Sequence, residues 1–282
     1  MFGCGGSIKL NTDSHFWIGS THKICQDYAL SGNQKGKQYA IVSDGCSSSP
    51  DTDWGSRFIA KAAERSIHLF PENPKAFSAV VASEARILCK TINLSQYALD
   101  ATLLVAIMNE HEVSVGCYGD GAFAFIYPEY ITIYIIDYES GAPFYLNYLN
   151  SIERTDVYVK EAGLNRYIQK IIIYPDKFVK EKKVSAPENI TEPGFIISHS
   201  LEDIIAVAVM SDGVLSYMQP SNTATSRTQT SVPVEDIVKE LLGFKGYAGV
   251  FVERRVQKFI KTCMQTGWHN CDDVSLAVIC AK

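Results

Sequence analysis

The chain has 282 residues, of which 46% are hydrophobic and 20% charged, and its formal net charge at pH 7 is −5. This is the composition of an ordinary globular protein. The mildly acidic balance, without a basic tract, argues against a nucleic-acid partner. The longest apolar runs, such as 204–210, are far shorter than the roughly 20 residues of a membrane-spanning helix, so no membrane partner is expected.

The apolar pattern of the first half predicts strands and two helices. Strands are expected at 14–20 and on both sides of a polar turn at 31–37, the second of them at 38–42. Apolar residues at helical spacing predict helices at 54–70 and 75–92. Further strands with short polar turns between them predict an antiparallel meander. They cover 102–107, 113–118, 122–127 and 131–136.

The second half begins with a stretch of poor periodicity, 137–193, which predicts a surface lid or insertion. After it we expect strands at 195–197 and 204–210 and a flexible polar loop at 219–231. Helices at 234–242 and 249–264 and a closing strand at 274–280 complete the chain. Without βαβ alternation, this order predicts an α+β layered fold and a single domain over 1–282.

The cysteines and the first residues bear on location. Eight cysteines are scattered along the chain, and none forms a C-x-x-C pair. Residues 1–6 lack the positive start and apolar core of a secretory signal. These features predict reduced thiols and a cytoplasmic protein.

Aspartates recur where predicted strands end. Asp44-Gly45 follows the strand at 38–42, and Ser211-Asp212-Gly213 follows the strand at 204–210. The predicted hairpin would bring Asp27 within reach of Asp44. Burying an unpaired carboxylate costs several kcal/mol, and a divalent cation, which prefers oxygen ligands, would offset that cost. Each Asp-Gly pair alone is also an ordinary turn signal.

Six fragments, in order, resemble the signatures of the metal-dependent protein phosphatases of the protein phosphatase 2C family. The resemblance extends over about 24–279. The fragments are Gln26-Asp27, Val42-Ser43-Asp44-Gly45, Thr102-Leu103-Leu104, Tyr118-Gly119-Asp120-Gly121, Met210-Ser211-Asp212-Gly213 and Asp272-Asp273-Val274-Ser275.

The resemblance implies a four-layer αββα sandwich, with two antiparallel sheets face to face, helices outside, and two Mg²⁺ or Mn²⁺ ions between the sheets at one end. By motif position, Asp44 would bridge the ions, and the carbonyl of Gly45 would complete one coordination shell. Asp212 and Asp272 would hold one ion, although a shift of one residue would exchange Asp272 with Asp273.

Two further acids take supporting roles in the same resemblance. Asp27 would orient a metal-bound water, and Asp120 matches a position linked to a third, weaker ion. Asp51 and Asp53 are better interpreted as loop or helix N-cap residues.

The chain departs from the family at two places. A phosphate-binding Arg of many members is replaced by His22, which has Lys23 beside it, so these two are the candidate substrate contacts. A His near the second signature, which some members use as an acid, is replaced by the run Cys46-Ser47-Ser48-Ser49.

The implied activity is hydrolysis of phosphoserine and phosphothreonine esters by a water that bridges two divalent ions. A phosphoprotein substrate and a cognate Ser/Thr kinase are the implied partners. The alternative, favoured by the two departures, is a catalytically weak or inactive regulatory module with the same fold. A third, remoter interpretation is a metal hydrolase of non-protein phosphoesters.

Overall fold

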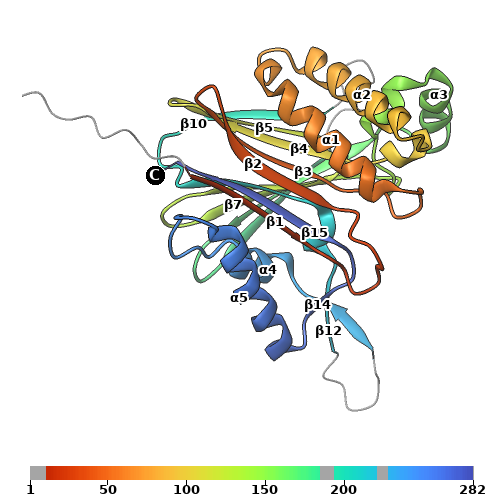
Figure 1. Cartoon of the computed structure of the whole chain (residues 1–282). Helices are drawn as coiled ribbons and strands as arrows, with labels where there is room; N and C mark the ends of the chain where they lie inside the picture. The colour runs from red at the N-terminus through yellow and green to blue at the C-terminus, as the bar shows by residue number, and fades with distance from the viewer. Residues whose placement is uncertain (1–10, 185–193, 221–227, 282) are drawn as a thin grey trace, which may run out of the picture.

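Two antiparallel sheets lie face to face in a computed structural model that describes residues 11–184, 194–220 and 228–281 (Figure 1). The seven-stranded sheet has the order β1 (Asn11–Trp17), β15 (Val274–Cys280), β11 (Ala206–Met210), β6 (Gly121–Ile126), β7 (Ile131–Tyr138), β8 (Arg166–Ile173) and β9 (Phe178–Val184). The five-stranded sheet has the order β10 (Phe195–Ser200), β5 (Glu112–Tyr118), β4 (Leu103–Met108), β3 (Lys37–Ser43) and β2 (Tyr28–Gln34). A small third sheet has the order β13 (Gln229–Ser231), β12 (Tyr217–Pro220) and β14 (His269–Asn270).

Helices cover the outer faces of the two large sheets (Figure 1). The five-stranded sheet is covered by α1 (Thr52–Ser66) and α2 (Pro74–Thr91), and the seven-stranded sheet by α4 (Val234–Leu241) and α5 (Phe251–Thr266). Short 3₁₀ helices η1 (Ile67–Leu69), η2 (Gln96–Leu99), η3 (Leu146–Asn150) and η4 (Asp212–Leu215) lie in connections, and α3 (Ile152–Glu161) follows η3. The αββα layers confirm the predicted α+β sandwich. No helix in the described ranges has the length and apolar character to cross a membrane.

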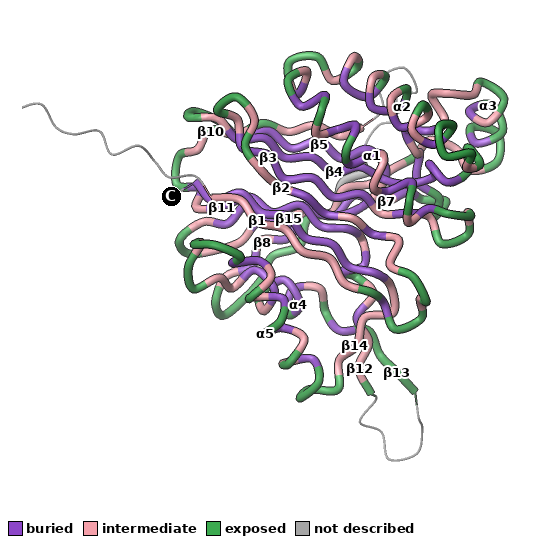
Figure 2. Tube along the Cα trace, viewed as in Figure 1, coloured by how far each residue is buried: buried purple, intermediate pink, exposed green. Residues whose placement is uncertain are grey.

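The central strands bury both faces, which explains their nearly continuous apolar sequences. In β6, Phe123 and Phe125 belong to the core between the sheets, whereas Ala122 and Ala124 belong to the core under α4 and α5. Figure 2 shows the central strands of both sheets as buried along most of their length. A rigid double layer of this kind holds the loops at its ends in fixed relative positions.

The predicted hairpin is confirmed and positions two acids. β2 and β3 are antiparallel neighbours, with Tyr28 opposite Ser43 at their open end. Asp27 and Asp44 are the next residues outward on the two strands, so both lie at the same end of the five-stranded sheet.

The predicted four-strand meander is wrong at its centre. β4 pairs with β5 in one sheet and β6 with β7 in the other, so the chain changes sheets between Tyr118 and Gly121. Gly119 and Gly121 have φ of 94° and 135°, a backbone region that favours glycine. The Gly-Asp-Gly signal therefore marks a crossing between sheets and not a hairpin.

The surface excursion is narrower than the predicted 137–193. β7 continues to Tyr138, and β8 and β9 extend the seven-stranded sheet, so the described excursion is 139–165. Residues 185–193 lie outside the described part of the chain. The ends of the predicted loop at 219–231 pair as β12 and β13, while 221–227 also lie outside the description.

Candidate active site

A cavity of about 290 Å³ lies where both large sheets end. Four carboxylates line it: Asp44 after β3, Asp120 between β5 and β6, Asp212 after β11, and Asp272 between β14 and β15. Strands far apart in the sequence thus bring four predicted site residues together, and Gly45 lines the same cavity. A larger cavity of about 520 Å³ elsewhere in the molecule contains none of the motif residues.

Backbone contacts fix Asp44. Its N–H donates to Thr102 Oγ1 at 3.2 Å, and its carbonyl accepts the Thr102 N–H at 2.8 Å. A Cβ at Gly45 would lie 2.7 Å from the carbonyl oxygen of Thr52, at the start of α1. Glycine is therefore required for the loop to pass this close to the helix.

Asp27 and Asp212 are linked through Ser211. Ser211 Oγ donates to Asp27 Oδ2 at 2.6 Å and accepts the Ser275 N–H at 2.9 Å. A Cβ at Gly213 would lie only 1.7 Å from the Asp273 carbonyl oxygen, so the Ser-Asp-Gly turn fits there only with glycine. Asp27 is fully buried behind the cavity wall.

Asp272 and Asp273 have opposite surroundings. The Asp273 side chain is 1% exposed, and it accepts the Gly19 N–H at 2.7 Å and the Gln26 N–H at 2.6 Å. The Asp272 side chain is 42% exposed and lines the cavity. Asp272 therefore lies at the cavity, whereas Asp273 fastens the segment that precedes β2.

Crowding of the carboxyl groups dominates the electrostatics. Burial, together with the charges of Asp27 and Asp212, raises the pKa of Asp44 well above its usual range. Burial, then Asp212, does the same to the pKa of Asp120. The carboxyl groups of Asp27, Asp44 and Asp212 are close enough that full charge on all three is unfavourable without a cation between them.

The donor set fits a divalent cation. Asp27 Oδ1 and Asp212 Oδ1 are buried without a hydrogen-bond partner, and such oxygens are ligands that Mg²⁺ and Mn²⁺ prefer. Across the described ranges, no three His, Cys, Asp or Glu side chains are placed together to hold a metal ion. A cation bound here would have to draw these carboxylates into one coordination shell and displace any protons that they carry.

The two candidate substrate contacts lie outside the cavity lining. His22 Nδ1 is 3.0 Å from Asp273 Oδ2, and His22 Nε2 is 3.5 Å from Asp272 Oδ1. Burial lowers the pKa of His22, but the two carboxylates outweigh it and raise that pKa above its usual value. Lys23 is exposed on the same loop. Among the described residues that line the cavity, none is Lys, Arg or His.

The sequence did not predict that Tyr145 and Asp100 belong to this site. Tyr145 lines the cavity from the excursion at 139–165, beside Cys46. The Asp100 carbonyl accepts the Cys46 N–H at 2.8 Å, and its side chain accepts Ser49 Oγ at 3.0 Å. Neither residue lies in a periodic segment or a motif, so no sequence signal connected them to the site.

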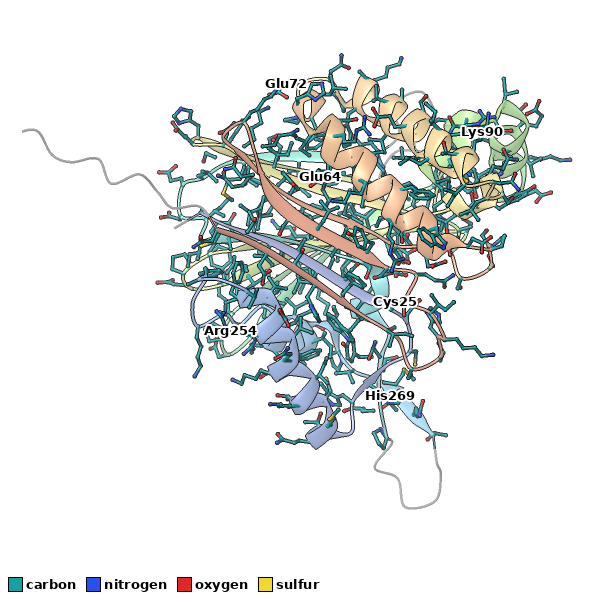
Figure 3. The ribbon with its side chains drawn as sticks, in the orientation of Figure 1. Cys25, Glu64, Glu72, Lys90, Arg254 and His269 are labelled. Atoms are coloured by element: carbon teal, nitrogen blue, oxygen red, sulfur yellow. The ribbon has the colours of Figure 1, made fainter. Side chains whose placement is uncertain are left out.

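Figure 3 places two labelled side chains relative to this end of the molecule. Cys25 lies in the loop that precedes β2, next to the strand ends, and Glu64 lies on α1 above the five-stranded sheet. Burial raises the pKa of Cys25 to about 12, so its thiol stays protonated at neutral pH. Cys25 therefore offers no thiolate nucleophile to the site.

Comparison with known proteins identifies the family. Strand-end acids line a cavity at one end of an αββα sandwich, and a model of the protein phosphatase 2C family matches residues 19–242. The chain belongs to this family of phosphatases, which is generally metal-dependent. A search of curated proteins finds no match.

Solved structures agree on the fold. The serine/threonine phosphatase of S. agalactiae is similar with a TM-score of 0.55 and 13% identity, covering 97% of this chain and 100% of that one. Stp1, a serine/threonine phosphatase from Staphylococcus aureus, has a TM-score of 0.52 and 13% identity, covering 97% and 95%. A structure described as a bacterial serine phosphatase has a TM-score of 0.54 and 13% identity, covering 96% and 97%.

Proposed function

We propose that the chain hydrolyses phosphoserine and phosphothreonine esters of phosphoproteins and uses Mg²⁺ or Mn²⁺ to do so. The observation that carries this proposal is the gathering of Asp44, Asp120, Asp212 and Asp272 around one cavity, in a chain of the protein phosphatase 2C family. Four carboxylates at one place would repel one another and would also repel a phosphate. Divalent cations bound between the carboxylates and the phosphate would offset both repulsions.

Each acid has a role that follows from its position. Asp44 and the carbonyl of Gly45 lie on the five-stranded side, and Asp212 and Asp272 face them from the seven-stranded side. Two ions held among them would supply an activated water and neutralise charge on the phosphoryl group, and Asp120 would hold a third. The serine hydroxyls of the loop after Gly45, Ser47 and Ser48, line the cavity where they can donate to phosphoryl oxygens.

Asp27 acts from behind this lining. One of its oxygens is held by Ser211 and the other has no partner, so the carboxylate is fixed with one free acceptor. It would orient a water at the wall of the cavity and keep that water's proton directed inward.

The test is hydrolysis of p-nitrophenyl phosphate with Mn²⁺ by the full chain, by Asp212→Asn and by Asp176→Asn. Asp176 is an exposed acid in the turn between β8 and β9, so its variant is the matched control and should equal the wild type. Asp212→Asn should lose about 100-fold or more of kcat/KM. Equal rates for the wild type and Asp212→Asn would exclude the proposed site.

The substrate class needs a second comparison. Phosphoserine and phosphothreonine peptides should be hydrolysed, and a Ser/Thr kinase would be the enzyme that supplies them. Activity on nucleotides or sugar phosphates but not on phosphopeptides would instead support a hydrolase of non-protein phosphoesters.

One observation favours the alternative of a catalytically weak or inactive regulatory module. The described cavity lining has no cationic side chain, and His22 lies against Asp273 and Asp272 instead of in the cavity. A module of this kind would bind Mn²⁺ and a phosphorylated partner without turnover. Calorimetric binding of Mn²⁺ combined with no release of phosphate from any substrate would identify it.

A further inference from the structure

The excursion between β7 and β8 places one aromatic side chain in the acidic cavity. All four carboxylates of the cavity come from strand ends, but Tyr145 comes from the segment 139–165, which is absent from the motif set. Its hydroxyl is the one phenol among the described lining residues.

Packing on both sides immobilises Tyr145. Phe144 is fully buried, with its ring 5.3 Å from the rings of Tyr148 and Tyr158. Leu146 is 1% exposed and belongs to the core beneath α1 and α2. Because the residues on either side of Tyr145 are anchored in different apolar clusters, the Tyr145 backbone cannot swing away from the cavity without exposing both of them.

Polar contacts anchor the same segment to the loop of the site. The Asp100 carboxylate accepts Asn147 Nδ2 at 2.9 Å, Arg154 Nη2 at 2.8 Å and Ser49 Oγ at 3.0 Å. Asp100 is only 3% exposed, so its charge is matched by a buried charge-assisted bond. One carboxylate therefore ties both the excursion and the loop that begins at Cys46 to a common point.

The Tyr145 phenol is a neutral donor. Burial, with smaller contributions from Cys46 and the nearby acids, raises its pKa well above the usual value for tyrosine. The neighbouring Cys46 sulfur is a weak acceptor and already contacts Ser48 Oγ at 3.1 Å. A phosphoryl oxygen is a far stronger acceptor for the Tyr145 hydroxyl.

We propose that Tyr145 is a substrate-contacting residue, whose hydroxyl donates to a phosphoryl oxygen of the bound phosphoester. This role rests on the proposed phosphatase function and deepens it. A neutral donor adds no positive charge that would compete with divalent ions for the acids. It also supplies the directional contact that a cavity without Lys, Arg or His in its described lining lacks.

The test compares Tyr145→Phe with Tyr130→Phe. Tyr130 lies in the turn between β6 and β7, at the end of β6 opposite the cavity, so its variant removes a phenol that cannot touch the substrate. With Mn²⁺ and p-nitrophenyl phosphate, Tyr145→Phe should lose about tenfold or more in kcat/KM. Its inhibition constant for inorganic phosphate should rise by a similar factor, because a hydrogen bond to a charged group is lost. Unchanged values in Tyr145→Phe would overturn the assignment.

Two further measurements distinguish failure of the proposed phosphatase activity from failure of the Tyr145 contact. If the wild type hydrolyses nothing, the proposed function fails, and calorimetry of inorganic phosphate with Mn²⁺ still tests Tyr145. Tighter binding of phosphate to the wild type than to Tyr145→Phe supports the contact, and equal or undetectable binding overturns it.

If Tyr145→Phe does not fold, Arg154→Gln keeps the phenol and loosens its anchor. Phosphate binding should then weaken in Arg154→Gln, and binding equal to that of the wild type would overturn the inference.

Discussion

Two adjacent aspartates show what single residues contribute to the site. Asp272 and Asp273 precede the same strand, so motif spacing alone could not choose between them. The structure separates them by burial and by hydrogen bonds, which depend on Gly19 and Gln26 at the other end of the chain.

The positions of Asp44, Asp120 and Asp212 at the cavity could be predicted because each follows a buried strand. Tyr145 could not be, because its position depends on packing within an irregular segment.

Substitution of these two aspartates should have opposite effects. Asp273→Ala leaves two backbone N–H groups without an acceptor and should lower the free energy of unfolding by about 2–4 kcal/mol. Asp272→Ala should change that free energy little in a chelator and should weaken Mn²⁺ binding. Urea unfolding with EDTA, followed by calorimetry with Mn²⁺, measures both. The reverse order of stabilities would show that the assignment of the pair is inverted.

A second residue-scale prediction concerns pH. The Tyr39 hydroxyl donates to Glu64 Oε1 at 2.5 Å, and Lys61 Nζ donates to Glu64 Oε2 at 2.9 Å. Burial raises the pKa of Glu64, but these hydrogen bonds outweigh it and lower that pKa below the usual value. Their contribution is therefore present above the unfolded-state pKa of about 4.3 and is lost as the pH falls through the folded-state value.

Tyr39→Phe should consequently be less stable than the wild type by about 1 kcal/mol at pH 7. The difference should shrink as the pH falls below about 4, because a protonated Glu64 accepts a weaker bond. Urea unfolding at several pH values measures this, with Tyr130→Phe as the control. A difference that stays constant between acid and neutral pH would contradict the account.

At the scale of elements, the excursion at 139–165 is an anchored cap of the site. Arg154 of α3 bonds to Asp100, and its guanidinium lies 4.8 Å and 4.7 Å from the ring centroids of Tyr97 and Tyr148. The sequence indicated an irregular surface segment here and could not reveal its attachment. The partners of Arg154 precede β4 or lie in η3, and nothing in their spacing relates them to one another.

Removing the anchor should loosen the cap. Asp100→Ala leaves the Arg154 charge partly buried without its partner, which should cost about 3 kcal/mol. Amide hydrogen exchange should accelerate in 139–165 and in the loop at 45–51, while the central strands keep their protection. Asp176→Asn serves as the control. Equal acceleration throughout the chain would indicate general destabilisation and not release of a cap.

At the scale of the whole molecule, the site exists only where the two sheets meet. The layer order was predictable because helical and strand periodicities alternate in long blocks, and the resemblance specified the sandwich. The division of strands between the sheets was not predictable, since Gly119-Asp120-Gly121 reads equally well as a tight turn. Knowing that both φ angles are positive requires the structure.

Cations should therefore stabilise the assembled sandwich. At a free Mn²⁺ concentration of 100 times Kd, the free energy of unfolding should rise by about 2.7 kcal/mol. Asp44→Asn should be more stable than the wild type in EDTA, because it removes a carboxyl group crowded by Asp27 and Asp212, and it should gain little from Mn²⁺. Thermal unfolding with and without Mn²⁺ measures both effects. An equal gain in both proteins would mean that the ion binds elsewhere.

The core between the sheets carries small side chains that hold the layers close together, among them Ala40, Ala106 and Ala277. The separation of Asp44 from Asp212 across the cavity is thus set partly by methyl groups inside the protein. One enlarged alanine could spread the sheets and displace the two acids while every motif residue remains in the sequence. A substitution of this kind would impair the site from the interior, and a count of intact motifs would not reveal it.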